Sequence, residues 1–236
     1  MSQNRTAIMQ PYFFPYLGYF QLINAVDCFV FYEDVHFMKK GWIHRNRTLV
    51  NKVDKLFTVP LKKASQNKLI YEIDLAIDDS WRNSFFKNLE FNYKSAPYYQ
   101  ETIEIIYKVL DNPTVNIAEL ASSSIIEVTK YLDLRKKFFF SSKDFDSSRG
   151  IKRDDRLIQI TKELSAKTYI NPSNGRALYD KDYFWQQDVE LLFIENQLTE
   201  YNQGTKEFIS GLSIIDVLMF NSVDSIKEML KEFKLI

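Results

Sequence analysis

Cysteine is almost absent from the 236-residue chain, in which Cys28 stands alone. A single cysteine forms no internal disulfide, and it excludes zinc sites built from several thiolates. It lies in the apolar run DCFVFY, which is typical of a buried, unreactive thiol. Histidine is scarce as well, and the 2 histidines have no partner at metal-ligand spacing. We therefore expect no metal site.

The sequence also lacks net charge, because 31 basic side chains balance 31 acidic ones. A neutral chain has no overall field to attract nucleic acid, so we expect no nucleic-acid partner. Long apolar runs are missing too: none approaches the roughly 18 residues that span a bilayer. Residues 1–10 lack the apolar core of a secretion signal. These absences predict a cytoplasmic protein without a membrane span.

Aromatic residues, in contrast, are abundant, with 19 Phe and 14 Tyr. Many gather in the N-terminal stretch IMQPYFFPYLGYFQLI, where Pro11 and Pro15 exclude regular structure between them. We predict a strand at residues 6–10, a helix at 16–25 and a strand at 27–33. This βαβ order places the proline-rich turn at the carboxyl end of the first strand, where open parallel sheets bind ligands.

The rest of the chain continues this alternation. We predict further strands at 55–61, 69–77, 136–142, 167–171 and 190–196, and helices at 81–94, 98–111, 116–134, 154–166, 179–188, 213–220 and 224–233. Alternating elements with short links indicate an α/β fold with a mostly parallel, Rossmann-like sheet. We expect a single domain over 1–236, with a helical insert at about 80–135. The polar stretch 141–155 is typical of a mobile loop and long enough for a lid.

The opening turn supplies the first candidate binding residues. We expect Gln10, Tyr12, Tyr16 and Tyr19 to face a ligand. Tyrosine hydroxyls bind phosphate or sugar oxygens, and flat rings stack on a base or a pyranose. Gly18 joins this set because it allows the helix to approach the strand closely. The alternative is that the rings bury one another in a rigid turn.

The segment DVHFMKKGWIHRNR supplies a basic cluster. If it is extended, Arg45 and Arg47 share one face, with His44 and Asn46 on the opposite face. Two arginines on one face form a fork for a phosphate or carboxylate, and Lys39 would add to it. Asn46 would position a sugar or base. The alternative is a solvated basic hairpin.

The third candidate segment is YNQGTKEFISGLSIID. Tyr201 and Gln203 follow a predicted strand, in a position equivalent to the opening turn, and would position a sugar or base. Ser213 begins a capping-box pattern that predicts a helix start. Residues 173–176 follow another strand and would suit a backbone anion cradle. No glycine-rich phosphate loop or nucleophile elbow is present, so the residues favour a binding site over any particular reaction.

These three segments, with VPL and the run SIIDVLMFN, resemble the WbqC-like protein family in order and spacing, from near the first residue to near the last. The resemblance implies a transferase of bacterial surface polysaccharide, such as the O-antigen of lipopolysaccharide. It would bind a nucleotide-linked amino sugar and attach an acyl or aminoacyl group, such as glycyl, to its amine. The acyl donor, any cofactor and the oligomeric state stay open. His36 and His44 stand where family members more often have amides, so neither is expected to be a shared general base.

Transfer to an amine needs a proton acceptor, for which Asp34 is our candidate. The strand and the Pro-x-x-Gly pattern at a helix start are also similar to the nucleotidylyltransferase-type fold, in which histidines contact nucleotide phosphates. Tyr16 and Tyr19 occupy those places, which disfavours adenylate-forming catalysis but leaves nucleotide binding open. Two alternatives therefore remain: a non-catalytic nucleotide-sugar-binding protein and an ATP-using ligase of nucleotidylyltransferase type.

Overall fold

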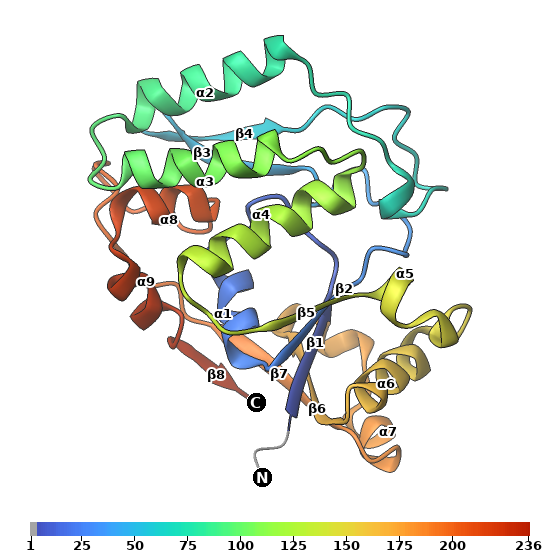
Figure 1. The fold of residues 1–236 in the computed structure, drawn as a ribbon. Helices are drawn as coiled ribbons and strands as arrows, with labels where there is room; N and C mark the ends of the chain where they lie inside the picture. The colour runs from blue at the N-terminus through green and yellow to red at the C-terminus, as the bar shows by residue number, and fades with distance from the viewer. Residues whose placement is uncertain (1–3) are drawn as a thin grey trace.

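The computed structural model describes residues 4–236, and its centre is a six-stranded sheet in the order β5-β2-β1-β6-β7-β8 (Figure 1). The strands are β1 (Asn4–Met9), β2 (Cys28–Phe31), β5 (Lys137–Phe140), β6 (Ala166–Pro172), β7 (Glu190–Asn196) and β8 (Phe233–Leu235). Five of them run parallel, and β8 is antiparallel to β7. The predicted α/β fold with a mostly parallel, Rossmann-like sheet is confirmed.

Helices cover both faces of this sheet, and others pack with a hairpin beyond it (Figure 1). They are α1 (Leu17–Ala25), α2 (Asp79–Tyr93), α3 (Tyr99–Asp111), α4 (Ile117–Tyr131), α5 (Ser141–Asp144), α6 (Arg153–Glu163), α7 (Lys181–Gln186), α8 (Ile214–Phe220) and α9 (Val223–Met229). Ala7 and Phe29 face a hydrophobic cluster that includes residues of α1 and α4. Their neighbours Ile8 and Val30 face a second cluster, with residues of α6 and α7. Burial on both faces explains why these strands read as continuous apolar runs.

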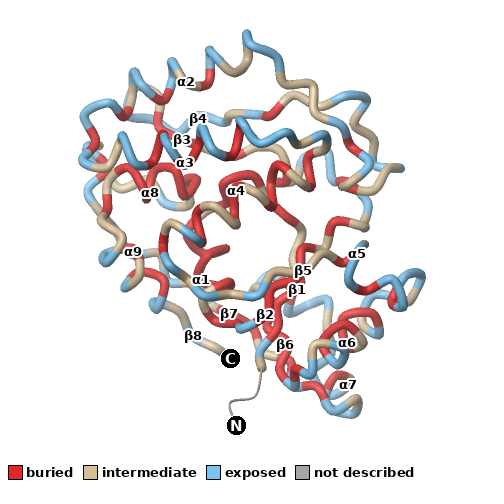
Figure 2. Tube along the Cα trace, viewed as in Figure 1, coloured by how far each residue is buried: buried red, intermediate tan, exposed pale blue. Residues whose placement is uncertain are grey.

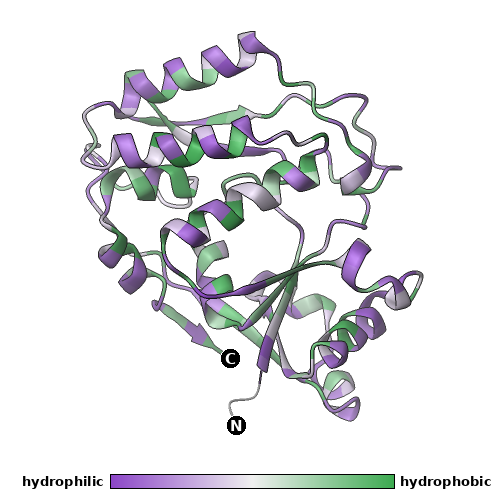
Figure 3. Ribbon diagram, in the orientation of Figure 1, coloured by the Kyte–Doolittle hydropathy of each residue, from purple (hydrophilic) through white to green (hydrophobic). Residues whose placement is uncertain are grey.

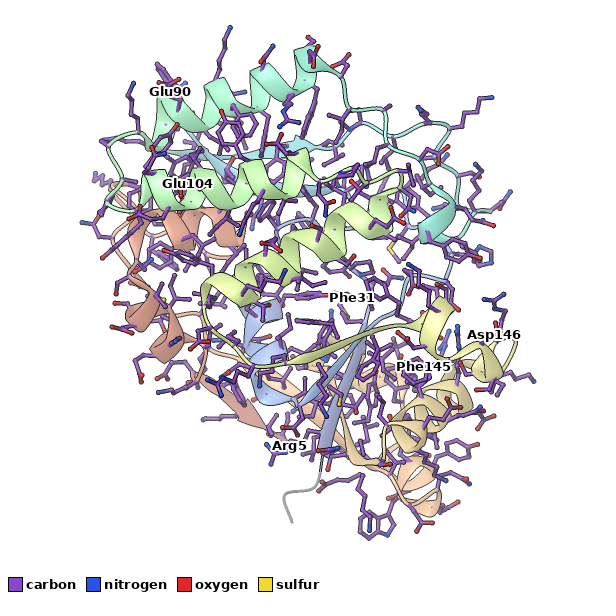
Figure 4. All side chains as sticks on the ribbon, viewed as in Figure 1. Arg5, Phe31, Glu90, Glu104, Phe145 and Asp146 are labelled. Atoms are coloured by element: carbon purple, nitrogen blue, oxygen red, sulfur yellow. The ribbon has the colours of Figure 1, made fainter. Side chains whose placement is uncertain are left out.

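A second layer lies beyond the carboxyl end of β1. It consists of the antiparallel hairpin β3 (Arg45–Val50) and β4 (Val53–Thr58) with α2, α3 and α4 (Figure 1). The inner helix α4 is mostly buried, whereas α2 exposes its outer side (Figure 2). Hydrophobic residues (green) and hydrophilic residues (purple) alternate along α3, as expected for a helix with one packed face (Figure 3). Side chains such as Phe31 fill the space between β2 and α4 (Figure 4).

The strand predicted at residues 69–77 is wrong. The chain there forms a 3₁₀ turn, η1 (Ile70–Glu72), followed only by isolated bridges. The Glu72 carboxylate accepts the Leu69 N–H at 2.8 Å, and the Ile70 N–H donates to the Val35 carbonyl at 3.0 Å. Because these backbone groups bond to a side chain and to a loop, they are not available for a continuous ladder with a strand.

The stretch 141–155, expected to be a mobile loop, is anchored instead. It forms α5, a 3₁₀ turn η2 (Asp146–Ser148) and the start of α6. Glu33 is buried, and its carboxylate accepts hydrogen bonds from the N–H groups of Ser141 and Ser142 and from the Ser142 hydroxyl. Negative charge at a helix start is favourable, so Glu33 fixes α5 to the end of β2.

The C-terminal helix is also shorter than predicted, because the chain leaves α9 at Met229 and adds β8 to the sheet edge. Within residues 4–236, no helix combines the length and hydrophobicity that crossing a bilayer requires.

Candidate functional site

The strand order places a crevice at the carboxyl ends of β1 and β6. The chain passes from β1 to β2 and β5 on one side, and then crosses β1 to reach β6 and β7 on the other. Open α/β sheets bind ligands where the strand order reverses in this way. Two cavities occupy the crevice, and both are lined by Met9 at the end of β1 and by Pro172 at the end of β6.

The first cavity, which we call the aromatic cavity, has a volume of about 310 Å³. The opening turn and α1 contribute Tyr12, Tyr16 and Tyr19 to its wall, and Trp42 and Asn46 come from the segment around the start of β3. Among the described residues that line this cavity, none carries a formal charge. Its size suits one sugar or base ring, at the small end of ligand pockets.

Phe14 gives the opening turn its shape. Its φ is 42°, a left-handed value that residues other than glycine rarely adopt. Its N–H donates to the Ser124 hydroxyl at 2.9 Å. Its carbonyl oxygen accepts from the Asn46 amide at 2.6 Å and from the Ser213 hydroxyl at 2.7 Å. Three distant segments therefore hold this strained residue and fix the turn that carries the tyrosines.

The three tyrosines differ in the use of their hydroxyl groups. The Tyr19 hydroxyl is buried and donates to the Gln10 carbonyl at 2.9 Å. The Tyr12 and Tyr16 hydroxyls have no hydrogen-bond partner within residues 4–236. Burial raises the pKa of Tyr12 to about 12, and the nearby Tyr16 contributes to this rise. Burial also raises the pKa of Tyr16. Both are thus neutral near pH 7 and free to donate to or accept from a ligand.

Gly18 lies where a side chain has no room. A Cβ atom there would stand 2.4 Å from a ring carbon of Tyr16 and 2.9 Å from the side-chain carbon of Asn196. The Asn196 amide donates to the Gly18 carbonyl at 3.1 Å, which joins the start of α1 to the end of β7. A side chain at this position would therefore meet the Tyr16 ring and the Asn196 side chain, so glycine is needed for the packing of this part of the aromatic cavity wall.

The second cavity, which we call the polar cavity, has a volume of about 610 Å³ and is lined by residues at the ends of β1 and β6 and by residues that follow β2. Gln10 lines this cavity, not the aromatic one. Arg153 at the start of α6 and His36 after β2 supply its basic groups, and no carboxylate belongs to the described residues of its lining. Asn174 lines both cavities, so the two share a wall.

The predicted arginine fork is engaged elsewhere. On β3, Asn46 is buried and both arginines are partly exposed, as the alternation requires. Arg45 donates to the carbonyl oxygens of Gly41 and Lys40, and its guanidinium lies over the Trp42 ring. Neither Arg45 nor Arg47 lines a cavity.

Arg47 joins β3 to its surroundings. It forms an ion pair with Asp54 at 2.9 Å and donates to the Ser210 and Gly211 carbonyls at 3.3 and 3.2 Å. Because Gly211 lines the aromatic cavity, Arg47 supports the cavity wall from outside. Lys39 is exposed and lies outside both linings.

Tyr201 and Gln203 belong to a hydrogen-bond network around buried Asp216, outside both cavity linings. The Tyr201 and Tyr93 hydroxyls donate to its two carboxylate oxygens at 2.6 and 2.8 Å, and Gln203 adds a bond of 3.0 Å. Burial raises the pKa of Asp216, although these three donors oppose the shift. The network lies at the start of α8, next to Ser213, and supports the segment that holds Phe14.

Asp34, the predicted proton acceptor, forms an ion pair with Arg156 of α6 at 2.5 Å. Its other oxygen accepts the Ser141 hydroxyl at 2.5 Å. The two charged side chains are 4% and 6% exposed, and Asp34 lines neither cavity. In this geometry the carboxylate is occupied by protein donors, and it anchors α6 to the end of β2.

The sequence analysis did not select Trp42, Leu198 or Arg153, all of which line the crevice. Trp42 lies in the basic segment already singled out, so a signal for it existed. Arg153 lies in a stretch that we interpreted as a loop, and no pattern marked it as a ligand-facing side chain.

The chain shows similarity to known proteins over nearly its whole length. Residues 10–228 match the model of the WbqC-like protein family. Over 219 residues the chain is 25% identical to the uncharacterized protein Rv1507c of Mycobacterium tuberculosis, which covers 92% of this chain and 93% of that protein. No solved structure shows significant similarity. The match includes every described residue that lines the aromatic cavity except Met9. The chain therefore belongs to the WbqC-like protein family.

Proposed function

We propose that the protein binds a nucleotide-linked amino sugar in the crevice and transfers an acyl or aminoacyl group, such as glycyl, to the sugar amine. The product would be a building block of bacterial surface polysaccharide, such as the O-antigen of lipopolysaccharide. The chain belongs to the WbqC-like protein family. The resemblance to that family is the reason for proposing this transfer reaction and not another reaction on a small molecule.

One observation carries the ligand assignment. The aromatic cavity lies where the strand order reverses, and it presents two neutral tyrosine hydroxyls, Tyr12 and Tyr16, that no described protein group engages. Aromatic faces with a few free hydroxyls are suited to a sugar or base ring, because the rings stack and the hydroxyls bond to ring substituents. The Trp42 ring and the Asn46 amide complete a wall of this kind.

The reaction joins an amine to an activated carbonyl. The sugar nitrogen forms a bond to the acyl carbon, the bond from that carbon to its leaving group breaks, and the amine proton departs with the leaving group. The protein would contribute mainly by holding the two reactants together, which supplies a large part of the rate in such reactions. Asp34 would serve as proton acceptor only if it left its ion pair with Arg156.

The second candidate function is non-catalytic binding of the same nucleotide sugar. The uncharged lining of the aromatic cavity favours it, since no described residue there is a conventional general base. The ligase alternative requires ATP, magnesium and an amino acid, and it predicts release of pyrophosphate.

The discriminating experiment incubates the purified protein with nucleotide-linked amino sugars and either acyl-CoA donors or glycine with ATP and magnesium. A gain of one acyl mass on the sugar supports the transferase. Ligand-induced thermal stabilisation without a mass gain indicates the binding protein, and pyrophosphate release that depends on glycine indicates the ligase. Tyr16→Phe is the variant to compare with the native protein, because it removes a hydroxyl that the proposal assigns to the ligand. Absence of both turnover and binding across the panel would exclude the proposal.

A further inference from the structure

The polar cavity is lined at its edge by one exposed arginine, Arg153. Within residues 4–236, Arg153 forms no ion pair or side-chain hydrogen bond. The acidic residues that follow it, Asp154 and Asp155, do not line the cavity. The Asp155 carboxylate accepts the Tyr183 hydroxyl, and Asp154 has one buried carboxylate oxygen without a hydrogen-bond partner among the described residues. A guanidinium in a concave site without a carboxylate is suited to bind an oxyanion.

The position of Arg153 is fixed by its helix. Three residues further along α6, Arg156 pairs with Asp34 and also donates to the Ser148 hydroxyl at 3.1 Å. Its guanidinium lies over the Tyr32 ring, 4.9 Å from the ring centre, and Tyr32 lines the polar cavity. The buried ion pair thus holds the first turn of α6 against the cavity, which keeps Arg153 at its edge.

Asn171 adds a buried polar group at the end of β6. It is 8% exposed, lines the polar cavity, and shares a bond of 2.6 Å with the Tyr169 hydroxyl. The Asn171 NH₂ group donates one of its two N–H bonds to the Tyr169 hydroxyl, which leaves the second N–H for a ligand. Gly175 leaves room for it, because a Cβ atom there would stand 2.4 Å from the amide oxygen.

We propose that the polar cavity is an oxyanion site that binds the diphosphate of the nucleotide-linked sugar, with Arg153 as its cation, while the sugar ring occupies the aromatic cavity. The identity of the ligand rests on the proposed function, whereas the oxyanion site itself does not. The two cavities are adjacent, because Met9, Pro172 and Asn174 line both of them, and the proposal has one molecule reach across these residues. A diphosphate sugar joins a ring and an anion covalently, as this arrangement requires.

Calorimetric titration of the full chain with sodium pyrophosphate, glycine and UDP-glucosamine tests the proposal. Arg153→Gln removes the charge, and Arg153→Lys keeps it. Arg135→Gln is the matched control, because Arg135 is exposed and precedes β5, at the opposite end of the sheet. We expect Arg153→Gln to weaken pyrophosphate binding by about tenfold or more, since a charge-assisted contact is lost. Arg153→Lys should retain most of the affinity, and Arg135→Gln should leave it unchanged.

The outcomes separate the two proposals. If pyrophosphate binding depends on Arg153 but UDP-glucosamine and its relatives do not bind, the oxyanion site stands and the proposed function falls. If UDP-glucosamine binds the native protein and Arg153→Gln equally well, the proposed function stands and this assignment is overturned. The assignment is also overturned if the native protein binds no pyrophosphate, or if only glycine binds through Arg153. Thermal melting checks that each variant is folded.

Discussion

The Ser213 hydroxyl donates a hydrogen bond to the Phe14 carbonyl oxygen at 2.7 Å, across 199 positions of the chain. The same hydroxyl oxygen accepts the Ile215 N–H at 3.3 Å and so caps α8. One side chain therefore joins a helix start to the strained turn that shapes the aromatic cavity. Loss of this side chain should affect both the stability of the fold and the affinity for a ring-bearing ligand.

We predict that Ser213→Ala lowers the free energy of unfolding by about 1–2 kcal/mol, because a cap is lost and a buried carbonyl loses one of its donors. It should also weaken sugar binding. Ser222→Ala is the control, because Ser222 caps α9 through the Ser225 N–H but does not reach the turn. Urea unfolding and ligand titration measure the two effects. Equal ligand affinity in both variants would show that Ser213 does not hold the cavity.

Removing one hydroxyl group at a time should separate ligand contacts from structural ones. Tyr16→Phe loses a hydroxyl without a described partner, so we expect weaker ligand binding and a change in unfolding free energy within about 0.5 kcal/mol. Tyr19→Phe leaves the Gln10 carbonyl without its bond and should cost about 1–2 kcal/mol. Chemical denaturation and calorimetry distinguish the pair. The interpretation is wrong if Tyr16→Phe destabilises the protein and leaves ligand affinity unchanged.

We predict that Asp34→Asn lowers the unfolding free energy by about 3–5 kcal/mol, because it leaves the buried Arg156 charge without its partner. Asp54→Asn is the matched control. It breaks an Asp–Arg pair with side chains 43% and 32% exposed, and should cost less than about 1 kcal/mol. Urea denaturation compares them. A fully stable Asp34→Asn protein that has lost turnover would instead identify Asp34 as a catalytic group.

The raised pKa of Asp216 makes a prediction about pH. Burial favours the protonated carboxyl in the folded state, so this group stabilises the fold fully below its unfolded pKa of about 3.9. That contribution is lost as pH rises through the folded-state pKa. The native protein should therefore lose stability relative to Asp216→Asn as pH increases from about 3 toward neutrality. Urea unfolding of both proteins at several pH values measures this difference, and a difference that is constant or changes in the opposite direction would contradict it.

The sequence revealed most of the sheet because its elements carry local signals. Continuous apolar runs marked the doubly buried strands, and Ser213 marked a helix start that the structure confirms. Residues 69–77 have strand-like side chains, but their backbone bonds go to a loop and to Glu72, and side-chain alternation does not reveal those partners. The stretch 141–155 is anchored by the buried carboxylate of Glu33, which lies 108 positions from Ser141. Local composition does not reveal a partner so distant in the sequence.

The tyrosine side of the candidate site could also be predicted from local sequence signals. Tyr12, Tyr16, Gly18 and Tyr19 are close in sequence, and one turn brings them together. The roles of the charged residues could not be predicted in this way, because their partners are distant in the sequence. Arg47 bonds to residues 163 and 164 positions away, and Asp34 meets a partner 122 positions away. A polar side chain that bonds to a structural partner distant in the sequence has the same local sequence pattern as one that is available to bind a ligand.

The wall between the two cavities consists of Met9 at the end of β1, Pro172 at the end of β6 and Asn174 just beyond it. β1 and β6 are neighbours in one sheet, at the spacing of about 4.8 Å typical of such strands, and this pairing helps to keep Met9 and Pro172 in place. Any single molecule that fills both cavities must therefore have a minimum length. A sugar monophosphate, one phosphate shorter than a diphosphate sugar, should lose the contact at one end. Comparison of the two affinities would show whether the crevice selects its substrates by reach.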